Sequence, residues 1–375
     1  MLTECKPRPA LIGMERSDMV GLCRSAGVKP VHAETLLAHV FRHHTHDIRT
    51  IPDLPQALYG WLEQHTKTLE IKLITQQTAS DGTCKMLLAM PDGKEVETVL
   101  IPGKNRLTQC ISTQIGCAMN CSFCLTGTAG LTRNLSAAEM VAQIIITMDH
   151  HDERASNLVL MGMGEPMHNY EEVARFVRIV TDMKGMAFSP RRVTVSTAGH
   201  VPGIQRMIAD RLPCNLALSL NATNDETRNR IMPINKRWPI AEVLYWTGEF
   251  ARITHKRILV EYVMLAGIND TDMDAKRLIQ VLEGMPCTIN LLPFNTYPGS
   301  LYLRPESARI SAFRRILAEA GKVVVIRESR GRDISAACGQ LYTSAKHNQQ
   351  KNRTKRLTQK TTNCSDYLWQ QSNPD

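Results

Sequence analysis

The sequence predicts an α/β protein with a mostly parallel sheet, preceded by a helical segment and a small antiparallel unit. Three observations support this fold class. Strand-like and helix-like patterns alternate from about residue 107 to 327, which is typical of repeated βα units. Residues 70–112 show a two-residue apolar period, whereas residues 1–66 show a helical period. The parallel sheet is expected to be open or curled into a partial barrel.

The first segment, residues 1–66, is expected to fold separately as a helical domain. Apolar residues from Leu36 to Phe41 recur at helical spacing, and Pro55 marks the entry to a further helix. Helices are therefore expected at 15–26, 33–43 and 56–65.

The second segment, residues 67–106, is expected to be an antiparallel extension. Asp81-Gly82 and Asp92-Gly93 are typical hairpin turns. Alternating apolar residues around these turns predict strands at 71–78, 84–90, 95–101 and 107–113, the last of which leads into the third segment.

The third segment, residues 107–343, carries the alternating pattern of strands and helices. Further strands are expected at 157–162, 192–196, 215–220, 257–264, 288–293 and 322–327. Helices are expected at 137–150, 170–184, 201–211, 240–254, 271–283 and 305–319. In such folds the functional site lies at the carboxyl ends of the strands, so motifs in those loops matter most.

Composition limits the cellular setting. The sequence has no run of about eighteen apolar residues and no apolar secretory signal after Met1, so no membrane association is expected. Eleven cysteines, unevenly spread, do not resemble a secreted disulfide framework. A reducing cytoplasm is the expected compartment.

Charge favours a polyanionic partner. The formal net charge is +9, and part of it lies in the tail of residues 344–375, which is predicted to be disordered and basic. That tail is either an RNA-binding arm or a solubilising end.

Cys117, Cys121 and Cys124 form the most informative motif of the chain. Iron–sulfur clusters ordinarily use four cysteines, so three would leave one iron of a cubane open to a substrate or cofactor. A structural zinc site would need a fourth ligand and usually pairs its cysteines in separated knuckles. Three unrelated buried cysteines are a further alternative.

The sequence after the next predicted strand, Gly162 to Pro166, supplies glycines and the carboxylate of Glu165. Together with Phe123 before the last cysteine, these motifs resemble the radical S-adenosylmethionine (SAM) superfamily. The resemblance implies a partial (β/α)6 barrel with a [4Fe-4S] cluster held by the three cysteines. It also implies that SAM bound to the open iron is split to give a carbon radical.

Further motifs narrow the resemblance. Val96–Val99, Cys110–Ser112, Met232–Lys236 and Ala336–Leu341 resemble those of adenine-methylating RNA methyltransferases, the RlmN/Cfr family. The match extends over roughly residues 16–345.

The resemblance implies a role for three residues. Cys338 matches the methyl carrier, Cys110 the cysteine that resolves the protein–RNA adduct, and Glu97 the acceptor of the ring proton. Without the resemblance, Cys338 and Cys110 would be ordinary buried thiols. The alternation around Glu97 would place that carboxylate in solvent.

Residues that match SAM contacts in the family follow several predicted strands: Gly164, Glu165, Ser196, Ser219, Leu220, Asn221 and Asn295. Asn221 departs from the family pattern, in which histidine is common. An amide donates and accepts hydrogen bonds but cannot become cationic near neutral pH.

The resemblance implies methylation of carbon 2 of adenine in 23S rRNA and in tRNA, with two SAM molecules used per turnover. Methylation of carbon 8, as in the Cfr branch, is the close alternative, and a non-catalytic, zinc-stapled RNA-binding protein is the distant one. The implied partners are the RNA, gripped in part by the helices of residues 1–66, and an electron donor such as flavodoxin or ferredoxin. A monomer is expected.

Overall fold

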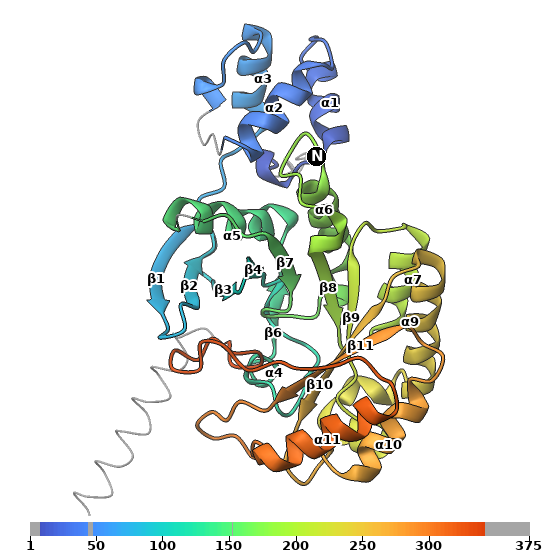
Figure 1. Cartoon of the computed structure of the whole chain (residues 1–375). Coiled ribbons are helices and arrows are strands. Elements are labelled where there is room, and N and C mark those ends of the chain that lie inside the picture. Colours follow the sequence, from blue (N-terminus) through green and yellow to red (C-terminus); the bar gives the residue numbers. More distant parts are fainter. Residues whose placement is uncertain (1–7, 44–47, 152, 342–375) are drawn as a thin grey trace, which may run out of the picture. The chain divides into compact units, whose positions relative to one another are not determined.

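The computed structural model describes residues 8–43, 48–151 and 153–341, and its main feature is a ten-stranded sheet (Figure 1). The strand order is β1-β2-β3-β4-β7-β8-β9-β10-β11-β12. The first four strands are antiparallel: β1 (Lys72–Thr78), β2 (Cys84–Ala89), β3 (Glu95–Gly103) and β4 (Arg106–Cys110). From β4 onward neighbours are parallel: β7 (Asn157–Leu160), β8 (Val193–Thr197), β9 (Asn215–Ser219), β10 (Ile258–Met264), β11 (Cys287–Pro293) and β12 (Val324–Ile326).

The α/β fold class predicted from the sequence is confirmed. The antiparallel strands nevertheless continue the parallel sheet and do not form a separate layer. Cys110 of β4 pairs with Val99 of β3 in antiparallel register and with Val159 of β7 in parallel register, so one strand joins both parts.

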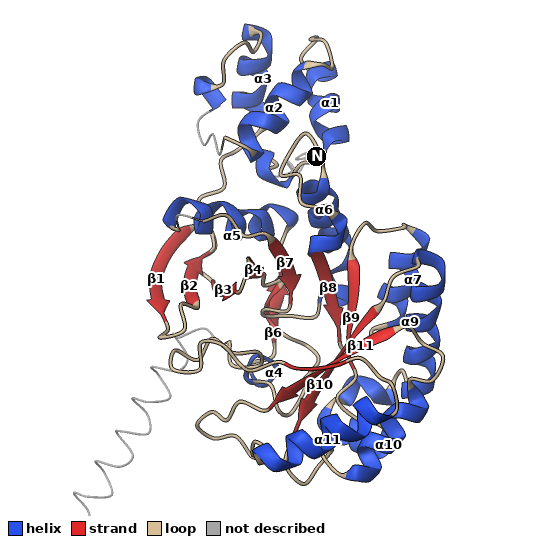
Figure 2. Ribbon diagram, in the orientation of Figure 1, coloured by secondary structure: helices blue, strands red, loops and turns tan. Residues whose placement is uncertain are grey.

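Six crossovers join the seven parallel strands, and their helices lie on the outer face of the curved sheet (Figure 2). The main helices are α5 (Ala137–His150), α6 (Tyr170–Thr181), α7 (Val201–Ala209), α9 (Ile240–Thr254), α10 (Asp272–Val281) and α11 (Ser307–Glu319). Local sequence explains their starts. At α5, Ser136 and Glu139 form a reciprocal capping box that satisfies two backbone N–H groups.

The N-terminal helices are α1 (Arg16–Ser25), α2 (His32–Phe41) and α3 (Gln56–His65), close to the predicted ranges. Their buried side chains belong to the same hydrophobic core as α5 and α6. Arg16 also donates two hydrogen bonds to the Asp182 carboxylate, at 3.0 and 2.8 Å. Residues up to Leu341 form one compact unit, in which these helices share a core with α5 and α6. Their role as an RNA-binding accessory domain stays a prediction.

Four short elements near the cysteine motif were not predicted: β5 (Gln114–Gly116), α4 (Leu125–Thr128), β6 (Leu131–Asn134) and α8 (Asp225–Ile231). The strand expected at 107–113 ends at Cys110, and β5 then pairs with β6 as a separate two-stranded sheet. Such elements contain too few residues to show a periodic pattern.

Two further expectations concern the C-terminal tail and membrane-spanning helices. The predicted tail of residues 344–375 lies outside the described residues. Within the described ranges, no helix has the length and apolarity needed to cross a bilayer.

Candidate active site

A cavity of about 170 Å³ lies at the carboxyl ends of the parallel strands. Most of the residues predicted for the site line it: Cys117, Cys121, Cys124, Gly164, Glu165, Ser196, Ser219, Asn221, Asn295 and Cys338. Three predicted residues, Glu97, Cys110 and Leu220, do not. The fold therefore gathers strand ends, the cysteine loop and a C-terminal turn around one space.

The cysteine loop is held by backbone hydrogen bonds at each end. Cys117 follows β5 and its N–H donates to the Gly130 carbonyl at 3.0 Å. Cys124 directly precedes α4 and its N–H donates to the Cys121 carbonyl at 3.1 Å. Burial raises the pKa of all three thiols, that of Cys117 to about 12, where Glu165 and Cys124 add to the effect of burial. A metal centre must therefore displace protons as it binds.

The donor set fits an iron–sulfur cluster better than a single ion. Within the described residues, no three Cys, His, Asp or Glu side chains are spaced to hold one metal ion, whereas structural zinc needs four ligands on one atom. In a cubane each thiolate binds a different iron, so the three thiols do not have to converge. Three thiolates leave the fourth iron open to another ligand.

Two polar atoms in the cavity also indicate a ligand. In the described part of the chain, Asn295 Oδ1 and Glu261 Oε2 are buried without a hydrogen-bond partner, and both residues line the cavity. A buried polar atom without a partner costs about 1–3 kcal/mol. Their position fits the polar groups of a small cofactor such as SAM.

Both carboxylate oxygens of Glu165 accept hydrogen bonds from backbone N–H groups of the protein. Its Oε1 accepts from the Met167 N–H at 3.1 Å, and its Oε2 accepts from the Ala198 N–H at 2.7 Å. The carboxylate thus ties the loop after β7 to the end of β8. Burial raises its pKa, and the hydrogen bonds from Ala198, Thr197 and Met167 oppose that rise. Each oxygen keeps a further lone pair that can face the cavity.

Asn221 supports the site through its amide. Its Oδ1 accepts from the Val263 N–H at 2.8 Å and its Nδ2 contacts Met232 Sδ at 3.2 Å. Its φ of 57° lies in the left-handed region, which asparagine tolerates better than most residues. The adjacent Leu220 side chain is fully buried, and its backbone N–H donates to the Glu261 carbonyl. Asn221 therefore fits its place without a positive charge.

Cys338 reaches the cysteine loop because the C-terminal segment packs on α4. Leu125 N–H donates to the Gly339 carbonyl at 2.8 Å, and Thr126 Oγ1 donates to the Leu341 carbonyl at 2.6 Å. The Cys338 side chain is exposed to the cavity, although surrounding protein atoms desolvate it enough to raise its pKa. Arg327 opposes that rise.

Cys110 meets Cys338 in a second cavity of about 60 Å³, which both residues line. Cys110 is buried at the end of β4, and both thiols are free. Burial raises the pKa of Cys110 well above its usual range, and the neighbouring Cys338 adds to this effect. Cys338 therefore lines both the cavity of about 170 Å³ and the cavity of about 60 Å³.

Glu97 lies on β3 but lines neither cavity. Its alternation predicts exposure, yet the residue is buried and its Oε1 lies 3.1 Å from Lys85 Nζ. Lys85 Nζ also donates to the Ser335 carbonyl at 3.3 Å, three residues before Cys338. The lysine thus connects Glu97 to the segment that carries Cys338.

Two charged residues were missed from the sequence. Glu261 of β10 lies in the wall of the cavity, where its Oε1 is 3.6 Å from Arg327 Nη1 and accepts from Asn290 Nδ2 at 2.8 Å. A carboxylate inside an apolar parallel strand is a signal that could have found it. Arg228 of α8 is fully buried beneath the site. Its short polar helix gave no such signal.

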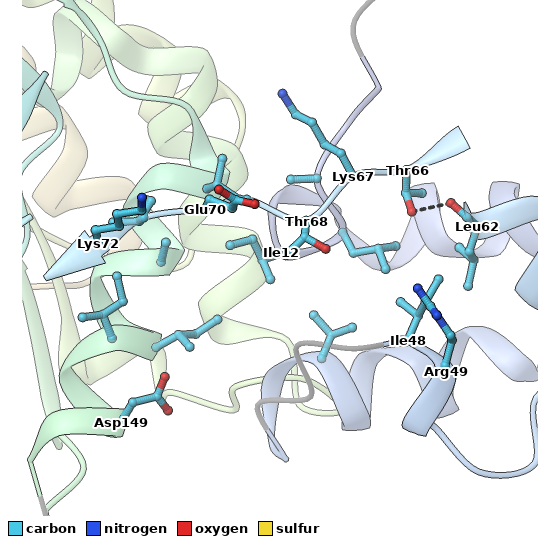
Figure 3. Close-up of a pocket in the computed structure, with 18 of the residues that line it drawn as sticks. Ile12, Ile48, Arg49, Leu62, Thr66, Lys67, Thr68, Glu70, Lys72 and Asp149 are labelled. Carbon is cyan, nitrogen blue, oxygen red and sulfur yellow. Dashed lines mark hydrogen bonds between the residues drawn. The ribbon is translucent and has the colours of Figure 1, made fainter. Parts of the chain in front are cut away.

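A larger cavity of about 1170 Å³ lies elsewhere, around the chain between α3 and β1 (Figure 3). Its labelled polar residues, among them Lys67, Glu70 and Asp149, carry charges of both signs. It contains none of the predicted site residues. The chemistry therefore belongs to the smaller cavity at the strand ends.

Comparison with known proteins agrees with this geometry. The profile of the radical SAM superfamily matches residues 111–279. A dual-specificity RNA methyltransferase RlmN from Rhodospirillum rubrum is 43% identical over 350 residues, which cover 90% of this chain and 82% of the relative. The chain belongs to the RlmN family of radical SAM RNA methyltransferases.

Other similarities support the same family. An RlmN from Pelobacter propionicus is 43% identical over 318 residues, covering 85% of this chain and 91% of that protein. A crystal structure of a radical SAM methyltransferase from Sphaerobacter thermophilus matches with a TM-score of 0.83 and 39% identity, over 89% of this chain and 99% of that one. Membership of the radical SAM superfamily implies a [4Fe-4S] cluster and SAM as cofactors. The RlmN family resemblance, the enzyme class and the barrel fold are thus confirmed.

Proposed function

We propose that this protein methylates carbon 2 of an adenine in 23S rRNA and in tRNA, with Cys338 as the methyl carrier. One observation carries the proposal: Cys338 lines both the cavity of the cysteine loop and the cavity of Cys110. A carrier must be reached by a methyl source on one side and by a resolving thiol on the other. Carbon 2 of adenine is a poor nucleophile, so direct displacement on SAM would not suffice.

The cofactors would occupy the cavity of about 170 Å³ at the strand ends. Cys117, Cys121 and Cys124 would hold the cluster, and the residues at the ends of β7, β8, β9 and β11 would surround SAM. When bound, these groups supply a carbon radical that can remove a hydrogen atom from a methyl group. We expect two SAM molecules per turnover, one as methyl donor and one as radical source.

Cys338 would act first as a nucleophile. Its thiolate forms the sulfur–methyl bond as the sulfonium–methyl bond of SAM breaks. Arg327 favours the thiolate, since its charge lowers the pKa of Cys338 against the effect of burial. Once the carbon is attached to RNA, the Cys110 thiolate attacks the Cys338 sulfur. The sulfur–carbon bond then breaks, and its electron pair stays on the carbon, which takes up a proton to become the methyl group of the RNA. The two sulfurs are left as a disulfide that a dithiol reductant must reduce before the next turnover.

Glu97 is our proposed acceptor of the ring proton. In the structure its Oε1 lies 3.1 Å from Lys85 Nζ, and this contact orients the carboxylate that would act as the base. Catalytic hydrogen bonds often tighten only when substrate is bound, so its place outside both cavities is compatible with this role. Glu97→Gln should lower the methylation rate by about two to four orders of magnitude, the usual contribution of a general base. Methylation at the wild-type rate would remove Glu97 from the mechanism.

The remaining partners follow from this chemistry. A one-electron donor such as flavodoxin or ferredoxin would reduce the cluster, and a reducing cytoplasm would keep the carrier thiols free. Nothing in the site needs a second copy of the chain, so we expect a monomer.

The test is anaerobic turnover with SAM, a reductant and an unmodified RNA fragment, followed by mass spectrometry of the nucleosides. We expect 2-methyladenosine with wild type. Cys338→Ala should keep its iron content and make no methylated adenosine. 8-Methyladenosine as the sole product would favour the Cfr-type reaction, and normal turnover by Cys338→Ala would overturn the carrier mechanism.

A further inference from the structure

Arg228 is an unusual residue in this site because a guanidinium is buried there without an acidic partner. It is fully buried, and in the described part of the chain no carboxylate forms an ion pair with it. An unpaired buried charge is strongly destabilising, so arginine rarely lies inside a protein without a compensating negative group.

All of its bonds go to neutral oxygen atoms. Nε donates to the Leu220 carbonyl at 2.9 Å, and Nη2 donates to the carbonyls of Ala198 at 2.6 Å and Ser219 at 3.2 Å. Nη1 donates to Asn235 Oδ1 at 2.9 Å. One guanidinium therefore ties together the ends of β8 and β9, but the dipoles of these groups balance only part of its charge.

The charge of Arg228 lies under the cysteine loop, and the nearest carboxylate on its own helix, that of Asp225, is joined to it only through Asn235. Ser122, between Cys121 and Cys124, donates its N–H to the carbonyl of Ile231 at 3.0 Å. Ile231 is the last residue of α8, about one turn beyond Arg228. Ile231 and Met232 share a buried cluster with Phe123 and Cys121.

We propose that Arg228 is a positioning residue whose buried charge stabilises the reduced state of the cluster held by Cys117, Cys121 and Cys124. A [4Fe-4S] core with three thiolates has a net charge of −1 when oxidised, and one electron makes it −2. A fixed cation nearby favours the more negative state, so it makes the reduction potential less negative. This inference rests on the proposed cluster and adds a residue that controls how readily an external one-electron donor reduces it.

Two variants separate charge from structure. Arg228→Gln keeps hydrogen-bond donors but removes the charge. The double variant Asp225→Asn/Asn235→Asp uses the existing hydrogen bond between Asn235 Nδ2 and Asp225 Oδ1, at 2.8 Å. The exchange places the carboxylate at position 235, whose side-chain oxygen accepts from Arg228 Nη1, and removes it from position 225. The net charge and the guanidinium are both unchanged. Arg230→Gln, at an exposed position of the same helix, is the matched control.

The experiment is a dithionite titration of the full-length, anaerobically reconstituted protein, followed by electron paramagnetic resonance. At the wild-type midpoint potential, we expect the reduced-to-oxidised ratio to fall about tenfold in Arg228→Gln and in the double variant. For a one-electron couple, this corresponds to a midpoint about 59 mV more negative. Arg230→Gln should keep the wild-type midpoint.

The outcomes are distinct. A wild-type midpoint in the double variant would overturn the inference, even if Arg228→Gln failed to fold, because that variant keeps the arginine and its bonds. A wild-type protein that binds no iron under these conditions would contradict the proposed function itself.

Discussion

Cys338 combines exposure to the cavity with a raised pKa, and Arg327 is the residue that moderates that rise. The guanidinium is held in place by Glu261, whose Oε1 lies 3.6 Å from Nη1. In the proposed mechanism, methyl transfer to sulfur needs the thiolate, so the fraction of Cys338 that is ionised would limit the first step. We therefore expect Arg327, which lowers the pKa of Cys338, and Glu261, which raises it, to set the reactivity of the proposed carrier at a given pH.

Arg327→Met should make Cys338 less reactive. Removing the cation raises the thiol pKa further, so the pH profile of alkylation by iodoacetamide moves to higher pH. The rate near pH 8 should fall several-fold. Peptide mass spectrometry of the reconstituted protein without SAM measures Cys338 alone. Arg332→Met, at an exposed position of the same segment, is the control and should keep the wild-type profile. An unchanged profile in Arg327→Met would show that Arg327 does not tune the thiol.

Cys110→Ala should stop the reaction after RNA is attached to the protein. The resolving thiolate would be absent, so a covalent adduct between Cys338 and RNA should accumulate, detectable as a shifted band that ribonuclease removes. Cys84→Ala removes another buried thiol that matches no catalytic position and should release its RNA normally. Free methylated RNA at the wild-type rate from Cys110→Ala would assign resolution to a different group.

At this scale, the sequence predicts residues whose role depends on a motif and misses those whose role depends on packing. Cys117, Cys121 and Cys124 are close in the chain, so their spacing alone indicates a shared centre. Arg228 becomes special only because the fold buries it under that centre. The burial of Glu97 also follows from contacts with distant residues such as Ser335 through Lys85, which no local alternation contains.

Among the elements, the hairpin of β5 and β6 fixes the entry to the cysteine loop. Gly116 has a φ of +78°, and an added Cβ would lie 1.8 Å from the Gly130 carbonyl oxygen. Only glycine fits there. Cys117 follows directly and donates its N–H to that same carbonyl, so a shift at Gly116 moves a proposed cluster ligand.

Gly116→Ala should therefore reduce cluster assembly, seen as a large loss of iron bound per chain and of the brown absorbance. Gly130→Ala is the matched control. Its φ of +70° is also positive, but an added Cβ meets nothing within 4 Å, so it should cost only about 1–2 kcal/mol and keep most of its iron. Equal iron content in the two variants would mean that the hairpin does not position the cysteines.

Long elements were predicted well and short ones were not. The ranges expected for α3, α5 and α9 agree with the structure because each shows at least two helical turns of apolar spacing. The hairpin strands are three and four residues long, and their pairing is fixed by a glycine contact across the cysteine loop. Such a contact cannot be read from periodicity.

Over the whole molecule, one continuous core joins the N-terminal helices to the barrel. The sequence predicts a boundary near residue 66 because the apolar period changes there, and in the structure the last N-terminal helix ends at His65 and the first strand begins at Lys72. Tertiary contacts nevertheless cross it, including the two hydrogen bonds from Arg16 to Asp182. Removing residues 1–66 would expose apolar side chains of α5 and α6, so loss of RNA binding in such a truncation would not separate recognition from folding.

Surface charge provides the cleaner test of RNA binding by these helices. Arg24 and Lys29 are exposed, and within the described residues neither forms an ion pair. The double variant Arg24→Glu/Lys29→Glu should keep the wild-type melting temperature but bind RNA several-fold more weakly. The magnitude of the slope of log affinity against log salt should fall by about 1–2. Each phosphate contact that is lost means that about one counterion fewer is released when RNA binds. Arg314→Glu/Arg315→Glu on α11 makes the same change of net charge at exposed positions of another helix. An equal loss of affinity in both double variants would mean that RNA responds to total charge and that the N-terminal helices have no special part in its recognition.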